Sequence, residues 1–295
     1  FGFQHIAHQK LSQIQYPFTH TDIMRYPAGF NLGYSSDGIA STLTGAILSF
    51  LIHPLLAYNL TIILLLTLNA YCSHLLFKHL SSSTTLAFLG GIIYGFSSYN
   101  LARAASHLNL LFTAGWPLLI WSFLRFPKHP KLHNYLLLFF PFIVITLGSL
   151  QYLIMSTVAI PIILLLTIFL ANSSVTTFTK NLLSNPKHLI TGAFINLIFL
   201  LILIGPYLIA LFSNNLSLDY RADIASAPPI LRYFFLPNYF SQTLISSLSN
   251  PLDSSIEQVF FIGFIELILF IFLLLRQPFT KIKLQLTLLT LIFFF

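Results

Sequence analysis

The sequence predicts an all-α fold, a polytopic transmembrane helix bundle, from its composition and from the way its apolar residues are grouped. Of 295 residues, 56% are hydrophobic and only 7% are charged. Ordinary soluble domains carry roughly 25% charged residues. The apolar residues form separate runs, each near the roughly 20 residues that a helix needs to cross a hydrocarbon core of about 30 Å. We therefore expect several spans and no water-soluble core.

Eight apolar runs are candidate spans, and the second is short and interrupted by glycine. They cover residues 55–77, 86–98, 108–125, 132–148, 152–171, 189–212, 259–275 and 284 onward. The fourth and fifth share one stretch that is divided at Gly148-Ser149, so a count of seven or nine remains open.

The expected domain organisation is a single transmembrane domain over residues 1–295. The chain begins at Phe1 without Met and stops inside an apolar run, so we expect it to be a fragment truncated at both ends. Its expected parts are an outer loop with an interfacial helix (1–54), about six spans (55–212), an outer loop (213–258) and further spans (259–295).

The charged residues indicate which side of the membrane each loop faces. With loops numbered alternately, nine of the fourteen basic residues share one side: Lys78, Arg125, Lys128, Lys131, Lys180, Lys187, Arg276, Lys281 and Lys283. Every acidic residue outside a span falls on the other side: Asp22, Asp37, Asp219, Asp223, Asp253 and Glu257. Because positive charge marks the cytoplasmic side, the acidic loops are expected to face outward. The alternative is that loops simply need polar residues.

Several function classes are not expected from this sequence. The net charge is +7, but basic residues stand singly between apolar runs and form no stripe, so no nucleic-acid partner is expected. There is no Gly-Lys-Ser phosphate loop, no His-Glu-x-x-His pair and no Gly-x-Ser-x-Gly elbow. The single cysteine, Cys72, allows neither a disulfide framework nor a Cys-based metal site.

The first outer segment is expected to be an ordered loop followed by an interfacial helix. Residues 16–38 are rich in turn formers, aromatics and polar side chains, with acids at Asp22 and Asp37. Residues 39–52 place apolar side chains on one helical face and end before His53-Pro54, which is short for a span. A re-entrant or tilted span is the alternative.

Two further groups of polar residues are candidate substrate-binding residues. The second outer loop contains Asp219, Arg221, Asp223 and Glu257, which suit a polar substrate, although a loop that is merely solvated has the same composition. Arg103 and His107 lie at the outer end of two spans and suit phosphate contact or proton transfer. Snorkelling of Arg103 to lipid head groups is the alternative.

Several motifs resemble a family of bacterial multi-spanning membrane proteins similar to GT-C glycosyltransferases. The resemblance covers most of residues 16–275. It rests on Pro17-Phe18-Thr19-His20-Thr21-Asp22, Tyr26 to Leu32, Ala57-Tyr58-Asn59-Leu60, Phe96 to Leu110, Gln151-Tyr152, Asp219 to Asp223, Leu236-Pro237-Asn238 and Glu257 to Gly263.

The resemblance implies an enzyme that transfers a sugar from a polyprenyl-phosphate donor to a lipid, glycan or protein on the outer face. It implies a multi-pass protein of the bacterial plasma (inner) membrane, in contact with membrane lipid. Asp22 best matches the acid of the first outer loop that acts as base or orients the acceptor. Arg103, His107 or Arg221 would stabilise the departing phosphate, a role that a divalent metal can also fill. The family pattern suggests another acidic motif upstream of Phe1, which this chain lacks.

Two other classes of protein remain open. A membrane transporter or flippase of a polar or lipid-linked substrate predicts broken helices and charge near the bilayer midplane. Only Glu266 lies clearly within a span, and the Gly-broken run around 90–95 favours transport. A noncatalytic envelope-assembly protein is the third alternative. The sugar, the acceptor and the oligomeric state are not encoded in recognisable motifs.

Overall fold

The computed structural model describes residues 2–23, 29–31, 38–81, 83–127, 129–157, 160–161 and 175–213. These residues are mostly helical, and the strands among them form one two-stranded sheet. The all-α class is therefore confirmed for the described part of the chain. Contacts group the chain into two compact units, Phe1–Gly95 with His107–Asn215 and Phe96–Ser106 with Leu216–Phe295.

Several predicted features lie outside the described residues. The expected spans at 259–275 and from 284 onward are among them, as is most of the one at 152–171. The same holds for five of the predicted site residues: Asp37, Asp219, Arg221, Asp223 and Glu257.

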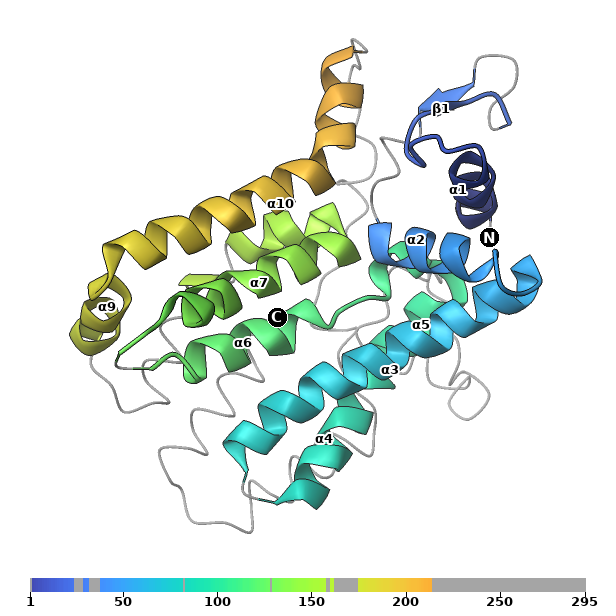
Figure 1. Ribbon diagram of the computed structural model, residues 1–295. Helices are drawn as coiled ribbons and strands as arrows, with labels where there is room; N and C mark the ends of the chain where they lie inside the picture. Colours follow the sequence, from blue (N-terminus) through green and yellow to red (C-terminus); the bar gives the residue numbers. More distant parts are fainter. Residues whose placement is uncertain are drawn as a thin grey trace, which may run out of the picture. The chain divides into compact units, whose positions relative to one another are not determined.

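The N-terminal part of the first unit contains two packed helices and a small hairpin (Figure 1). Helix α1 (Gly2–Ser12) packs against α2 (Ile39–Leu48), where Gln4 Nε2 donates to the Ser41 carbonyl oxygen at 3.0 Å. Between them in sequence, β1 (His20–Thr21) pairs antiparallel with β2 (Phe30–Asn31). Helix α1 was not predicted from the sequence.

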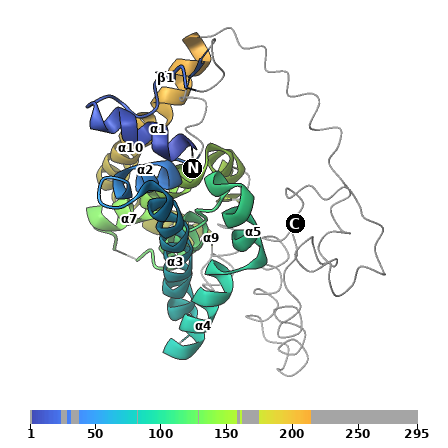
Figure 2. The same ribbon diagram turned by 90° about the vertical axis from the view of Figure 1, so that its right-hand side faces the viewer.

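Helices α3 (Pro54–Leu80) and α4 (Thr84–Gly95) lie side by side in both views (Figure 1, Figure 2). Pro54 is the first residue of α3. N–H groups in the first turn of a helix have no partner within the helix, so the N–H group that proline lacks costs no hydrogen bond there. Gly95 faces Ala70, and a Cβ on Gly95 would lie 2.5 Å from the Ala70 Cβ. The absence of this side chain therefore lets the two backbones approach closely.

The remaining elements of the first unit continue the helical packing. They are η2 (Leu108–Leu110), α6 (Gly115–Leu124), α7 (Leu132–Gly148), helical residues 150–157 and 160–161, α9 (Val175–Leu183) and α10 (Pro186–Ser213). Helix α7 packs against both α6 and α10, and α6 also packs against α3.

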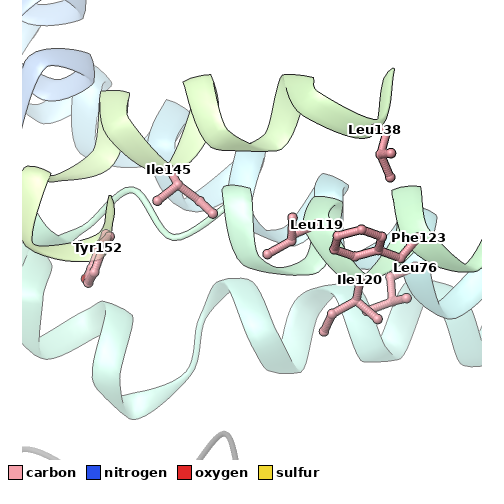
Figure 3. Packing of buried hydrophobic residues seen from close by; sticks show 7 residues of the cluster. All are labelled: Leu76, Leu119, Ile120, Phe123, Leu138, Ile145 and Tyr152. Carbon is pink, nitrogen blue, oxygen red and sulfur yellow. The ribbon is translucent and has the colours of Figure 1, made fainter. Parts of the chain in front are cut away.

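The apolar core of the first unit lies between α3, α6, α7 and the helix at 150–157 (Figure 3). Its buried residues are Leu76, Leu119, Ile120, Phe123, Leu138, Ile145 and Tyr152. Close packing of these side chains holds the helices of the unit together.

Two described helices are long and apolar enough to cross a membrane, α3 with 27 residues and the 24 residues Pro186–Ile209 of α10. They correspond to the runs expected at 55–77 and 189–212, and α7 corresponds to 132–148. Helix α4 has 12 residues, about 18 Å, which is less than the hydrocarbon thickness. The run at 108–125 is not one helix, because a non-helical segment separates η2 from α6.

Candidate functional site

Asp22 lies on an ordered turn that follows β1 and is solvent-accessible. Its carboxylate Oδ1 is 3.0 Å from His20 Nε2, and the two side chains are 55% (His20) and 78% (Asp22) exposed. His20 is the first residue of β1 and Asp22 follows the strand on the turn, so the bend after Thr21 brings the two side chains together. The result is a histidine–carboxylate pair that a substrate can reach.

Gly29 packs against this pair from the start of β2. Its φ of +72° is in the left-handed region, and a Cβ there would lie 2.5 Å from His20 Cε1 and 2.9 Å from Asp22 Oδ1. Glycine alone meets both demands, the backbone angle and the close approach. The turn is further held by the Ile23 N–H, which donates to Thr21 Oγ1 at 3.3 Å.

Residues before β1 anchor the hairpin to its surroundings. Pro17 and Phe18 are buried, and the Tyr16 ring packs edge-on against Phe18 with 5.9 Å between centroids. Desolvation by partial burial raises the pKa of the Tyr16 phenol, which therefore stays neutral at physiological pH. Thr19 Oγ1 donates to the Tyr16 carbonyl at 3.2 Å.

Lys10 connects the hairpin to α1. Its ammonium nitrogen donates to the His20 carbonyl oxygen at 2.8 Å. Helix α1 in turn binds α2, because His8 Nδ1 donates to the Ala46 carbonyl at 3.3 Å and its ring packs on Phe50. A continuous set of contacts therefore runs from the His20–Asp22 pair to the end of α2.

The residues expected to form an interfacial helix are helical only over Ile39–Leu48. The buried side of α2 consists mainly of small and polar residues, including Ser41, Thr42 and Gly45, because these sit against α1 and α3. Ile39, expected on the apolar outer face, is buried. Ile47, Phe50 and Leu51 are exposed, and the apolar surface continues at Leu55 and Leu56.

Basic residues gather at the opposite end of the first unit from Asp22. The C-terminal ends of α3 and α6 meet the N-terminal half of α7, since Leu76, Phe123 and Leu138 share one cluster. Tyr135 joins α7 to α9 through a hydrogen bond to the Leu182 carbonyl at 2.9 Å. This end carries Lys78, Arg125, Lys131, Lys180 and Lys187.

The end of the first unit that carries Asp22 is the end at which α3 begins. Lys78 lies in the last turn of this 27-residue helix, which is about 40 Å long. There α2 leads into α3, and a Cβ on Gly38 would lie 2.6 Å from Asn109 Cα at η2. Asp22 is the one acidic residue within the described ranges, and Lys10 is the basic residue that lies beside it.

Arg103 and His107 belong to different units, so the structure gives no geometry between them. In the second unit, Arg103 lies on α5 (Ser98–Ser106), is 6% exposed and stacks over the Tyr99 ring at 5.0 Å. In the first unit, His107 is half-buried, and its carbonyl accepts from the Leu110 N–H at 2.9 Å.

The non-helical backbone between η2 and α6 is buried and bound by side chains. Asn69 on α3 donates to the Leu111 carbonyl at 2.8 Å and accepts from the Thr113 N–H at 3.0 Å. Tyr94 on α4 donates to the Thr113 carbonyl at 3.0 Å. Backbone outside a helix is tolerated at membrane depth only when its polar groups are satisfied in this way.

A second helix break lies directly against the first. Helix α7 ends at Gly148, and the buried Ser149 is extended with φ −162° before the helix at 150–157 begins. A Cβ on Gly148 would overlap the Phe112 carbonyl oxygen. Tyr152 donates to the Leu110 carbonyl, so both breaks share one set of contacts.

The sequence predicted Asp22 as a site residue but indicated no role for His20, Lys10, Gly29 or Asn69. The His-x-Asp spacing, and an asparagine within an apolar run, were the available signals. No three of His, Cys, Asp or Glu come together to hold a metal ion in the ranges that the structure describes.

Comparisons of the chain with protein-family models, with curated proteins and with solved structures find no match.

Proposed function

We propose that the protein is a multi-pass membrane glycosyltransferase of the GT-C type. It transfers a sugar from a polyprenyl-phosphate donor to a lipid, glycan or protein acceptor on the outer face of the bacterial plasma (inner) membrane. The observation that supports this best is the solvent-accessible His20–Asp22 pair on an ordered turn, at the end of the first unit opposite Lys78, Arg125 and Lys131.

A membrane location is supported by the outward apolar surface of α3 and α10. Large apolar side chains on these helices are exposed: Leu55, Leu56, Ile63, Leu64, Leu68, Ile190, Phe194, Leu197, Ile198, Phe199, Leu201 and Ile202. A contiguous exposed surface of this kind marks contact with lipid or with another apolar partner. When lipid covers both helices and the basic end faces the cytoplasm, Asp22 lies on the outer side of the membrane.

The site supplies what inverting transfer requires. A carboxylate or imidazole within hydrogen-bond reach takes the proton of the attacking hydroxyl, and the His20–Asp22 pair offers both. A cation stabilises the departing phosphate, and Lys10 lies next to the pair through its 2.8 Å bond to the His20 carbonyl. Arg103, His107 and Arg221 are further candidates for phosphate contact. Asp37, Asp219, Asp223 and Glu257 are candidates for sugar or acceptor hydroxyls.

The experiment that tests the proposal uses the full-length protein in lipid nanodiscs with a panel of radiolabelled polyprenyl-phosphate hexoses and pentoses and a membrane extract. We expect label to move to a new product with the wild-type protein and to be lost in Asp22→Asn. Thr67→Val, an exposed change on α3, is the matched control. Failure of every donor with a folded protein would exclude the proposal, and unchanged transfer in Asp22→Asn would exclude Asp22 from the site.

Transport is a second candidate function, and the paired helix breaks favour it. The breaks at Leu111–Thr113 and at Ser149 lie against each other, and broken helices that meet inside a bundle are a feature of transporters. Uptake of a labelled polyprenyl-phosphate sugar into proteoliposomes, without transfer to any acceptor, would favour this class over the transferase. A protein that does neither would be assigned to envelope assembly.

A further inference from the structure

The proposed function leaves open which member of the His20–Asp22 pair takes the acceptor proton. From the geometry we infer that His20 is the proton acceptor and that Asp22 is the positioning residue that fixes its tautomer. This inference rests on the proposed function, because it assigns a role within the same site.

The hydrogen bond between the two side chains sets the tautomer. An ionised carboxylate can only accept hydrogen bonds, so the proton in the 3.0 Å contact is on His20 Nε2. The other ring nitrogen, Nδ1, then carries the lone pair in the neutral imidazole. Within the described residues Nδ1 has no hydrogen-bond partner, and the side chain is 55% exposed, so an acceptor hydroxyl can reach it.

The surroundings hold the pair in this arrangement. Gly29 lies close to both members of the pair, next to His20 Cε1 and Asp22 Oδ1. It therefore shields the hydrogen bond on that side. On the other side of the residue, Lys10 binds the His20 carbonyl and fixes the backbone from which the ring projects. Lys10 and Asp22 are the charged groups that approach His20 from the described elements packed against it.

The chemical step is balanced without any further reactant. The acceptor oxygen forms a bond to the anomeric carbon of the sugar while its proton moves to His20 Nδ1. The bond from the anomeric carbon to the phosphate oxygen breaks, and polyprenyl phosphate leaves with the electron pair. The imidazolium is stabilised by Asp22, as a carboxylate stabilises the imidazolium of a catalytic triad.

The test compares sugar transfer by variants of both residues, on the full-length protein in nanodiscs with the polyprenyl-phosphate sugar that wild-type protein accepts. His20→Gln is expected to lower kcat by roughly 10²–10⁴-fold with little change in the donor KM. Imidazole added to His20→Gly is expected to restore part of the rate.

Two controls separate a catalytic from a structural role. His79→Gln removes an exposed histidine at the basic end and is expected to leave the rate unchanged. In Asp22→Asn the rate is expected to fall without rescue by imidazole. ¹⁵N spectra of the histidine-labelled protein are expected to show an Nε2–H tautomer for His20 in wild type and a mixture in Asp22→Asn.

The outcomes distinguish failure of the proposed function from failure of the role assigned to His20. No transfer by the wild-type protein overturns the proposed function, and the role of His20 with it. Transfer that is unchanged in His20→Gln overturns only the role of His20 and leaves Asp22 as the base. An Nδ1–H tautomer in the wild-type spectrum also overturns it.

Discussion

Asn69, near the middle of α3, accepts a hydrogen bond from the backbone N–H of Thr113 at 3.0 Å, and its amide nitrogen donates to the Leu111 carbonyl at 2.8 Å. One side chain thus satisfies two backbone groups of the break between η2 and α6. Because Asn69 is fully buried, water cannot replace it.

Asn69→Leu is therefore expected to destabilise the protein by about 2–5 kcal/mol, because it orphans two buried backbone groups at about 1–3 kcal/mol each. The measurement is reversible SDS titration of the protein in mixed micelles. Thr67→Val is the control, since its hydroxyl is exposed and bonds only to Ile63 of its own helix. Its effect is expected to stay within about 0.5 kcal/mol. Equal effects of the two changes would show that the Asn69 contacts do not stabilise the break.

A substitution at Gly148 tests the contact between the two helix breaks. Gly148→Ala places a methyl group onto the Phe112 carbonyl oxygen, so either backbone must move, and we expect a loss of about 1–3 kcal/mol. Gly205→Ala in α10 is the matched control, because no atom lies within 4 Å of its added Cβ. The control is expected to be neutral or slightly stabilising. The same SDS titration measures both, and a Gly148→Ala protein as stable as the control would contradict the close packing.

The sequence predicted the helices that apolar length and turn residues define. The helix at 132–148 begins and ends as expected, and α3 extends the expected run 55–77 to Pro54–Leu80. Helix α1 could not be predicted, because its residues show little apolar periodicity and it is held by tertiary bonds from Gln4 and His8 to α2 carbonyls. The break within 108–125 has the same origin. Its apolar residues would continue a helix, and side chains from distant elements make the non-helical backbone favourable.

The candidate site, like the fold, could be predicted only in part from the sequence. The turn formers around Asp22 predicted an ordered loop, and Asp22 does lie on one. The His20–Asp22 bond depends on the bend that follows a strand only two residues long, and propensity does not reveal so short a strand. Gly29 and Lys10 reach the pair from segments that are distant in sequence, so no local pattern indicates them.

Gly29→Ala probes the support of the pair without removing either side chain. The left-handed backbone costs an alanine roughly 1–2 kcal/mol, and its Cβ would collide with the His20 ring and Asp22 Oδ1. We expect transfer of labelled sugar to fall by at least tenfold, while the helical core keeps its stability in SDS titration. Gly2→Ala, with no atom within 4 Å of the added Cβ, is the control and should transfer at the wild-type rate. Wild-type activity in Gly29→Ala would mean that the pair needs no support from β2.

Single-cysteine labelling tests whether the two charged ends lie on opposite sides of the membrane. Cys72 is buried in α3 and is first changed to Ala, which leaves a background free of cysteine. Thr19→Cys is exposed beside the His20–Asp22 pair, and Lys131→Cys and Lys180→Cys are exposed at the basic end. With a membrane-impermeant maleimide on intact spheroplasts, we expect Thr19→Cys to react at once and the other two only after permeabilisation. This follows because basic residues are retained on the cytoplasmic side. Labelling of all three in intact cells would contradict a spanning arrangement of the first unit, and labelling of the basic end alone would invert it and remove Asp22 from the outer face.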